Sequence, residues 1–449
     1  MARQFSSSQV SAPKILAAGF ITVILIGAGL LMIPAATHSG ISPVDALFTS
    51  TSAVCVTGLI VKNTPVDFTQ FGKTVILVLI QIGGLGYMSM ATFIALLAGK
   101  KIGISERILL KESLNIASYQ GIVRFIKGML FFVLTAESAG AIFLYLRFHY
   151  GYHLEVPFYQ AIFHSVSAFN NAGFSLFEGR LISFSSDSTV NLVIMSLIFL
   201  GGIGFTVVYD LCGRFTGKER SLMLHTRLVL MTSGLLIIVG AVLFYLGERH
   251  YLLSRSPLTG GETALVTLFS SVTARTAGFN TVDYSLLQHS TLFLTMVLMF
   301  IGASPGSTGG GIKTSTFSVV VLHVWSVIRG KSDTVAFNRT IPVDLVSKAL
   351  AVMSLSVMFV SAMTFAVVHI EHSQFLKTLF EVVSAFATVG LSTGDGGVLS
   401  YCATFSDLSK SIIILTMFAG RLGPLTLFMS LIEQEQQRVR YAEGRVMIG

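Results

Sequence analysis

The sequence predicts an all-α integral membrane protein with four parallel repeats around a central pore and eight membrane spans. Composition is the first observation, because 53% of the 449 residues are hydrophobic and only 12% are charged. Soluble domains carry about 25% charged residues. The second observation is a short phrase, rich in small and hydroxyl side chains, that occurs four times and ends at Gly58, Gly173, Gly278 and Gly390.

Eight apolar segments are long enough to cross a membrane. The first contains no charged side chain from Ile15 to Val44, and a bilayer core of about 30 Å needs roughly 20 apolar residues in a helix. It is too long for a signal peptide and lacks a cleavage site. The segments are predicted near residues 15–37, 73–98, 128–148, 190–212, 226–247, 291–322, 346–370 and 410–432.

A shorter apolar piece lies between the two spans of each successive pair and leads into one of the four phrases. These pieces cover about residues 44–54, 157–168, 262–274 and 376–387. Such a length is too short to span a bilayer and suits a re-entrant half-helix. The terminal glycines are 115, 105 and 112 residues apart, which indicates an internal repeat of a whole supersecondary unit.

Each repeat is therefore predicted as a span, a re-entrant pore helix, a filter loop and a second span. The predicted repeats are residues 1–127, 128–225, 226–345 and 346–449. Their loops are expected at residues 54–59, 169–174, 274–279 and 386–391. The second span of the third repeat is interrupted by a Gly-rich loop, residues 302–314.

The distribution of Lys and Arg predicts the orientation. With a cytoplasmic N-terminus, the inner segments carry 19 of these residues and the outer segments carry 7. Membrane proteins concentrate Lys and Arg in cytoplasmic loops. Both termini are therefore expected in the cytoplasm, with the half-helices entering from outside. The same rule explains the net charge of +8 without a nucleic-acid partner.

Four non-helical strands around one axis are expected to line a water-filled path, because unpaired backbone groups are not tolerated in lipid. Their carbonyl oxygens would replace the hydration shell of a cation, and each half-helix would direct the negative end of its dipole at the ion. Gly allows backbone angles that a side chain forbids. The alternative is that the phrases are mere turns between helices. The predicted filter residues are Val54, Cys55, Val56, Thr57, Gly58, Asn170, Asn171, Ala172, Gly173, Arg275, Thr276, Ala277, Gly278, Ala387, Thr388, Val389 and Gly390. The carbonyls expected to hold the ion are those of Val56, Thr57, Asn171, Ala172, Thr276, Ala277, Thr388 and Val389.

The Gly-rich loop is predicted to form a gate across the pore below the filter. It does not match a phosphate-binding loop, because Ile312 separates Gly311 from Lys313. A static kink in a long helix is the alternative. The predicted gate residues are Gly302, Ala303, Ser304, Pro305, Gly306, Ser307, Thr308, Gly309, Gly310, Gly311 and Lys313.

Three cationic residues need an explanation. Arg421 lies inside the last apolar segment, where an Arg normally faces protein or a water path. It is expected to reach the carbonyls of the Gly-rich loop or to form a positive barrier under the filter, unless it simply pairs with a carboxylate such as Glu381. Lys313 would line the lower pore or extend to the inner interface. Arg275 is expected to point backwards and brace the filter from behind.

Four short stretches of sequence resemble the filter motifs of the Trk/Ktr/HKT potassium transporters: C-V-T-G-L, F-N-N-A-G-F, T-A-R-T-A-G-F-N and F-A-T-V-G-L-S. The stretches G-G-L-G-Y, G-G-I-G-F and A-G-R-L-G-P-L-T, in the predicted helices, are similar to that family as well. The resemblance covers essentially the whole chain. An additional N-terminal pair of spans, typical of Trk subunits, is not found, so the likeness is greatest to the membrane subunit of bacterial Ktr systems.

This resemblance implies potassium as the transported ion, a preference that the family associates with Gly at the position of Gly58. It also implies a gating loop in the third repeat, a homodimer with one pore per subunit, and a cytoplasmic ring of Ktr-type regulatory subunits that bind the nucleotide. Location in a bacterial plasma membrane is expected. Sodium as a coupling or activating ion is left open.

Other functions are considered as alternatives. A membrane-embedded enzyme would need paired carboxylates, a Ser/His set or metal-ligand spacing inside the spans, and none is evident. A passive cation channel without a partner, or a sodium carrier, would share the same filter. The basic residues Lys100, Lys101, Arg107 and Lys111 would either face a regulatory subunit or only follow the positive-inside rule. The three cysteines are expected to be small packing residues.

Overall fold

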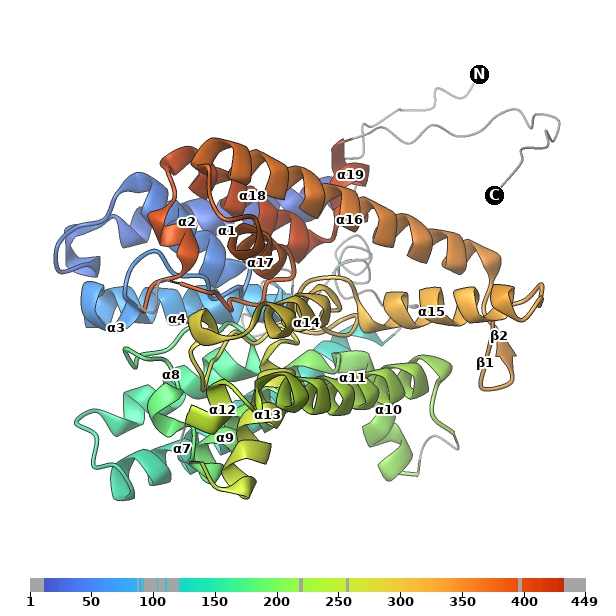
Figure 1. Ribbon diagram of the computed structural model, residues 1–449, viewed down its shortest axis with the longest axis horizontal. Helices are drawn as coiled ribbons and strands as arrows, with labels where there is room; N and C mark the ends of the chain where they lie inside the picture. Colours follow the sequence, from blue (N-terminus) through green and yellow to red (C-terminus); the bar gives the residue numbers. More distant parts are fainter. Residues whose placement is uncertain are drawn as a thin grey trace.

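The structure is a computed structural model of residues 1–449, and it describes residues 12–86, 89–90, 92, 103, 110, 121–217, 221–255, 258–394 and 398–431. Its described part is built almost entirely from helices (Figure 1). The basic residues Lys100, Lys101, Arg107 and Lys111 lie outside the described residues.

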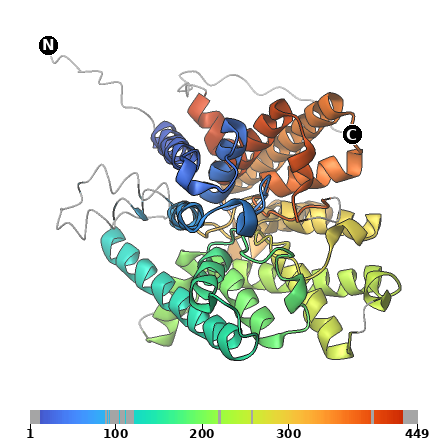
Figure 2. The same ribbon diagram turned by 90° about the vertical axis from the view of Figure 1, so that its left-hand side faces the viewer.

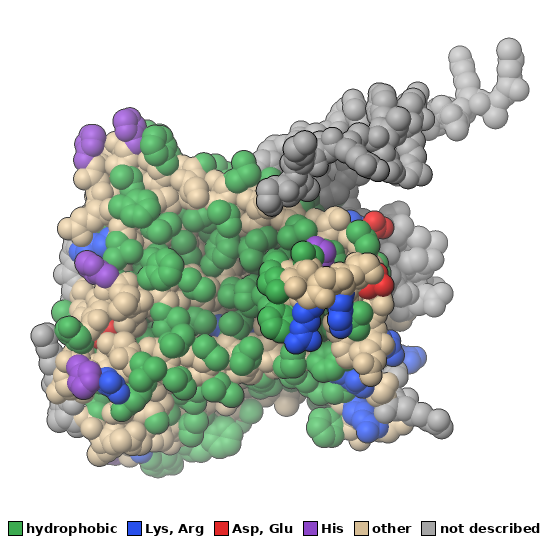
Figure 3. All heavy atoms as spheres, turned by 45° about the vertical axis from the view of Figure 1, so that its right-hand side comes forward, with side chains coloured by type: hydrophobic (Ala, Val, Ile, Leu, Met, Phe, Trp, Pro, Cys, Tyr) green, Lys and Arg blue, Asp and Glu red, His purple; other side chains and the backbone are tan. Residues whose placement is uncertain are grey.

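Four described helices are long and apolar enough to cross a membrane by themselves. They are α1 (Ala12–Leu31), α7 (Ile122–Tyr150), α11 (Leu224–Glu248) and α16 (Val343–Glu371). Large apolar side chains cover their outer faces, such as Phe131 and Phe365, each 74% exposed. Figure 3 shows hydrophobic side chains over the middle of one face and Lys and Arg side chains gathered toward its right-hand end. This distribution is typical of a protein surrounded by lipid.

Four half-length helices pack against these long ones: α2 (Pro43–Val54), α8 (Pro157–Phe169), α13 (Gly260–Thr273) and α17 (Phe375–Phe386). Each begins and ends within two residues of a predicted short piece. Local sequence determines several of their starts, since Pro at the first turn and a capping side chain both favour a helix N-terminus. Ser42 accepts from the backbone N–H of Asp45 at 3.1 Å, and Thr259 and Glu262 form a capping box.

One long helix, the half-length helix that follows it and a third helix make up a set. The third helix of each set is shorter than the predicted span. These helices are α4 (Gln70–Leu85), α9 (Ser188–Gly202), α14 (His289–Phe300) and α18 (Asp407–Leu422). Segments 190–212 and 410–432 were expected as continuous helices, but they break before α10 (Phe205–Phe215) and α19 (Pro424–Leu431). The helices α9 and α10 meet at 97°. A Gly with positive φ, Gly204 or Gly423, occupies each break, and that conformation is incompatible with a helix. The helix α4 likewise ends before Gly86, which has φ 79°.

In the third set the break is the Gly-rich loop, which lies between α14 and α15 (Thr314–Ile328). The four sets then close into a ring, because α4 packs on α8, α9 on α13, α14 on α17, and α18 on α2. Figure 2 shows the first and last segments, in blue and orange-red, in one half of the molecule, and the green and yellow segments in the other half. Loop segments run between the two halves.

The smaller elements lie in the connections between the main helices. The strands β1 (Val335–Ala336) and β2 (Arg339–Thr340) form an antiparallel hairpin with Val335 opposite Thr340. The remaining short helices are η1 (Pro34–Ala36), α3 (Thr64–Asp67), η2 (Ile182–Phe184), α12 (Leu252–Arg255), η3 (Tyr284–Leu286) and η4 (Tyr401–Thr404).

Candidate functional site

The four Gly-terminated phrases share one backbone conformation. Each has a non-Gly residue in the left-handed region, followed two residues later by a Gly with positive φ. The φ values are 51° at Val56, 57° at Asn171, 74° at Thr276, 49° at Thr388, 86° at Gly58, 67° at Gly173, 76° at Gly278 and 87° at Gly390. A left-handed conformation is uncommon for β-branched residues such as Val and Thr. Its occurrence at three of four matched positions therefore indicates that the surrounding fold imposes it.

The four terminal glycines, called the glycine ring from here on, lie next to one another in a closed cycle. A Cβ atom added to any one of them would overlap the backbone carbonyl of the neighbouring phrase. The partners are Gly58 with Ala172, Gly173 with Ala277, Gly278 with Val389 and Gly390 with Thr57. The phrases thus surround a common axis in chain order, and backbone is packed against backbone at every junction.

Buried hydroxyl groups hold the phrases from behind. Each lies in the last turn of a half-length helix and is hydrogen-bonded within its own phrase. The Ser52 Oγ donates to the carbonyl of Leu59 at 2.8 Å and accepts from the N–H of Gly58 at 3.0 Å. The equivalent hydroxyls are those of Ser167, Thr273 and Ser384. These contacts fix the start and the end of each phrase relative to its half-length helix.

The Arg275 side chain extends behind its phrase. Its Nη1 donates to the backbone carbonyl of Ser233 in α11 at 3.4 Å, and its guanidinium lines a small cavity with Phe199 and Ala303. The Arg275 charge is therefore directed away from the glycine ring.

The Gly-rich loop lies directly against the third and fourth phrases. The N–H of Gly310 donates to Thr388 Oγ1 at 2.9 Å, and Gly309 is so close to Thr276 Oγ1 that a Cβ would overlap it. The loop also reaches the break between α9 and α10, where Ser304 N–H donates to the carbonyl of Gly202 at 3.0 Å. At Gly302, Gly309 and Gly310 the close approach of neighbouring groups leaves no room for a side chain.

Two cationic side chains also contact this loop. The guanidinium of Arg421 donates to the carbonyl of Thr308 and to the carbonyls of Gly83 and Gly84 in α4. The Nζ of Lys313 donates to the carbonyl of Gly309 at 2.6 Å. Arg421 therefore joins α18, α4 and the loop through backbone acceptors.

Glu381, considered above as a partner for Arg421, makes other contacts. Its carboxylate accepts from the Ser392 hydroxyl at 2.7 Å and from the Cys402 N–H at 3.0 Å. It is buried in α17 and fixes the segment that follows the fourth phrase.

Sequence reasoning did not identify the roles of Glu137 and Gln81. The amide of Asn170 donates to Glu137 Oε1 at 3.0 Å and to Gln81 Oε1 at 2.8 Å. Gln81 Nε2 donates to Glu137 Oε2 at 3.2 Å. This buried network links α4 and α7 to the start of the second phrase. A carboxylate isolated in an apolar span was the available signal, because buried charge is retained only with polar partners.

Arg180 was also missed. It follows Gly173 by seven residues and is 8% exposed. Its guanidinium contacts carbonyls of the glycine ring. Nothing in the neighbouring sequence indicates this contact.

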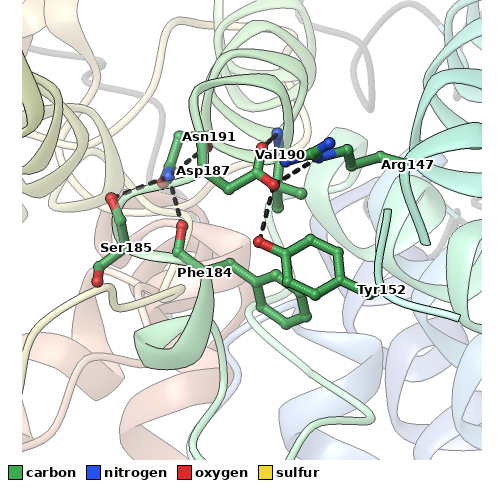
Figure 4. Close-up of polar contacts among 7 residues, drawn as sticks. All are labelled: Arg147, Tyr152, Phe184, Ser185, Asp187, Val190 and Asn191. Carbon is green, nitrogen blue, oxygen red and sulfur yellow. Dashed lines mark hydrogen bonds and ion pairs between the residues drawn. The ribbon is translucent and has the colours of Figure 1, made fainter. Parts of the chain in front are cut away.

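A polar cluster anchors the segment that carries Arg180 (Figure 4). Asp187 Oδ2 accepts from Arg147 Nε at 2.7 Å and from the Tyr152 hydroxyl at 2.8 Å. Asp187 Oδ1 caps α9 by accepting from the N–H of Val190 at 3.0 Å. Burial alone would raise the pKa of Asp187, but these hydrogen bonds outweigh it and hold the pKa below its ordinary value.

Metal-ligating side chains do not gather in the part of the chain that the structure describes: no three His, Cys, Asp or Glu residues are grouped for an ion. The three cysteines are free thiols, with Cys55 and Cys402 buried and Cys212 exposed.

An apolar exterior, half-length helices and a ring of backbone carbonyls define a membrane transport protein. The profile of the TrkH family of cation transport proteins matches residues 7–440, and the chain belongs to this family. This finding confirms the resemblance seen in the sequence. The family and the fold are those of ion transporters, not of enzymes.

Two curated relatives and one solved structure illustrate the similarity. The chain is 42% identical to Ktr system potassium uptake protein B of Bacillus subtilis, over 97% of this chain and 96% of that protein. It is 37% identical to the potassium/sodium uptake protein NtpJ of Enterococcus hirae, over 98% of each chain. The fold is similar to that of the potassium transporter TrkH of Vibrio parahaemolyticus, with a TM-score of 0.73 and 20% identity over 96% of this chain and 87% of that one.

Proposed function

We propose that this chain takes up potassium ions across a bacterial plasma membrane, through the axis of the glycine ring and down the electrochemical gradient. The observation that carries the proposal is the closed cycle of four phrases whose carbonyls surround one axis. Carbonyl rings replace the hydration shell of a monovalent cation. Membrane potential favours inward movement of such an ion by about 2.3 kcal/mol per 100 mV. The printed name of the Bacillus subtilis relative, a potassium uptake protein, supports the choice of ion.

The carbonyls proposed to bind the ion are those of the two residues before each terminal Gly. The C-termini of α2, α8, α13 and α17 point toward the phrases, so the negative ends of four helix dipoles favour a cation at the axis. The hydroxyls of Ser52, Ser167, Thr273 and Ser384 are engaged in hydrogen bonds behind the phrases.

The proposed architecture has four units, residues 1–127, 128–225, 226–345 and 346–449, and eight crossings. In it, α1, α7, α11 and α16 each cross the membrane. The other four crossings are α4 and the broken helices α9–α10, α14–α15 and α18–α19. Both termini are placed in the cytoplasm, in keeping with the excess of Lys and Arg in the inner segments.

The Gly-rich loop is proposed as the gate. In the structure it contacts the third and fourth phrases, and Arg421 and Lys313 hold two of its carbonyls. Permeation requires the loop to leave this position, which means giving up these hydrogen bonds. The static-kink alternative predicts that shortening residues 304–311 leaves the ion flux of a folded protein unchanged.

Regulation is proposed to come from a homodimer that sits on a cytoplasmic ring of nucleotide-binding subunits. The word "system" in the name of the Bacillus subtilis relative supports the existence of a further component. A soluble protein with a dinucleotide-binding fold is expected to co-purify with the chain from its native cell, and repeated pull-downs without one would argue against this part.

Sodium is the second candidate ion, because the Enterococcus hirae relative is named for potassium and sodium together. The same flux assay decides between the two. A chain that carries sodium as well as potassium, with similar saturation, would favour the joint function.

The test of the main proposal is ion flux into proteoliposomes under an inward-negative potential, with sodium, rubidium and lithium as competitors. Gly58→Ser is the test variant, because Gly58 has φ 86° and a Cβ there overlaps the carbonyl of Ala172. Gly29→Ser in α1 is the matched control, since open space surrounds Gly29. Potassium-selective flux that only the first substitution impairs is expected. A folded parent protein without cation flux, even with regulatory subunits, would refute the proposal.

A further inference from the structure

Arg180 places a positive charge at the glycine ring. Its Nη1 donates to the carbonyls of Gly278 and Gly390 at 2.6 and 2.9 Å, and its Nη2 donates to the carbonyl of Gly58 at 3.3 Å. These acceptors belong to the first, third and fourth phrases, and Arg180 itself follows the second. One guanidinium thus connects three phrases that are far apart in the chain.

A potassium ion that loses hydration water at the proposed entrance would need these carbonyls as replacement ligands. A guanidinium and a potassium ion are both monovalent cations that bind carbonyl oxygens, so the two compete for one place. Burial lowers the pKa of Arg180 to about 10, and the buried Glu381 carboxylate counteracts this. The side chain therefore keeps its charge at neutral pH.

The surroundings provide a second place for the side chain. A cavity of about 150 Å³ adjoins Arg180 and is lined by Glu178, Asp283, Asn280 and Ser392. Two of these residues are carboxylates, the preferred partners of a guanidinium. The Arg180 backbone has φ 53°, and the polar cluster around Asp187 anchors the chain beyond it. The backbone can therefore stay in place while the side chain moves.

We propose that Arg180 is a tethered cation that occupies the outermost carbonyls of the glycine ring and withdraws toward Glu178 and Asp283 when a potassium ion binds. The inference rests on the proposed function, because it needs the glycine ring to be the ion path. It makes Arg180 a residue that sets the apparent affinity for external potassium. The apparent dissociation constant rises as the fraction of time with a free ring falls.

The experiment measures potassium uptake into proteoliposomes as a function of external concentration. Arg180→Gln is expected to lower KM by about fivefold or more. This is the change expected if Arg180 leaves the glycine ring free for about a fifth of the time or less in the parent. Arg180→Lys retains a charge and is expected to remain near the parent. Arg249→Gln, at an arginine that is exposed and lies in a predicted outer segment, is the control for net charge and is expected to leave KM unchanged.

A second variant leaves Arg180 intact, in case its replacement prevents folding. Glu178 is exposed, so Glu178→Gln is expected to fold. It weakens the withdrawn position and is expected to raise KM by about twofold or more. This opposite shift is not predicted if Arg180 is only a structural brace.

The outcomes separate the two proposals. Potassium-selective flux in the parent, with KM unchanged in both Arg180→Gln and Glu178→Gln, would overturn the tethered-cation inference and leave the proposed function standing. Loss of selectivity in Arg180→Gln and Arg180→Lys alike, with Glu178→Gln unchanged, would make Arg180 a brace and also overturn it. A parent without potassium flux would overturn the proposed function and this inference with it.

Discussion

The backbone N–H of Gly310 donates to the side-chain hydroxyl of Thr388 at 2.9 Å, so the Gly-rich loop is tied to the fourth phrase by a buried hydrogen bond. The contact joins a residue of the proposed gate to a residue of the proposed ion path. The position of the Gly-rich loop and the conformation of the fourth phrase are therefore energetically linked.

Thr388→Val is expected to raise potassium flux in the absence of regulatory subunits. The substitution keeps the side-chain shape but leaves the Gly310 N–H without its acceptor, and an unpaired buried donor costs about 1–3 kcal/mol. This penalty destabilises the loop in its observed position. A penalty of about 1.4 kcal/mol shifts the equilibrium tenfold toward the open position, so a tenfold increase in basal flux is expected. Thr388→Ser restores the hydroxyl and should behave as the parent. Equal flux in the Val and Ser variants would show that the bond does not hold the gate.

Arg421→Ala is expected to raise the maximal uptake rate, because Arg421 holds the Thr308 carbonyl of the loop and two carbonyls of α4. Arg421→Lys separates the two roles considered for this residue. Lys keeps the charge but presents one ammonium group, which does not reproduce the planar fork of a guanidinium. A tether predicts that the Lys variant resembles Ala, whereas a positive barrier predicts that it resembles the parent. A change confined to the amount of protein in the membrane would favour a structural role.

Glu137→Leu is expected to destabilise the protein and to weaken discrimination between potassium and sodium. It removes the carboxylate that Asn170 and Gln81 contact, and each buried polar group left unpaired costs about 1–3 kcal/mol. Glu137→Gln keeps one acceptor oxygen and should lose less. Thermal unfolding in detergent and competitive flux measure the two effects. A Leu variant with the parent's melting temperature and selectivity would exclude a bracing role.

The short helices and the four phrases were predictable because their signals are local. A half-length apolar run followed by a Gly phrase indicates both the helix and its end, and the observed α8 (Pro157–Phe169) and α17 (Phe375–Phe386) lie within a residue of the predicted pieces. The interruption after α14 was also visible, since five glycines occur within residues 302–311.

The break at Gly204 was not predictable in the same way, whereas Pro424 directly after Gly423 is a local signal for the end of a helix. Gly is common in membrane helices, so the apolar pattern continues through Gly204. What ends α9 is packing from elsewhere in the chain: Phe205 N–H donates to the carbonyl of Gly306 at 2.9 Å. The destination of the Arg180 side chain depends on three other phrases for the same reason. Contacts of this kind exist only after the four sets have assembled.

The final prediction concerns Asp187, whose carboxylate joins α7 to the start of α9. Its pKa is lower in the folded protein than in the unfolded chain, since hydrogen bonds outweigh the effect of burial. A carboxyl group of this kind stabilises the fold at pH values above its unfolded pKa, and that contribution is lost as the pH falls through the folded pKa. It should therefore be constant near neutral pH and decline below about pH 4.

Asp187→Asn tests this directly, because Asn caps a helix about as well as Asp but presents an amide where Arg147 and Tyr152 donate. The Arg147 side chain is 43% exposed, so the loss is expected to be small, about 1–3 °C in melting temperature at pH 7. The difference from the parent should shrink as the pH falls below about 4, since both side chains are then uncharged. Tyr152→Phe removes one of the donors that lower the pKa of Asp187, so it should reduce the melting temperature at pH 7 and show a weaker form of the same pH dependence. A gap between parent and Asn variant that persists at low pH would show that the charge of Asp187 does not stabilise the segment carrying Arg180.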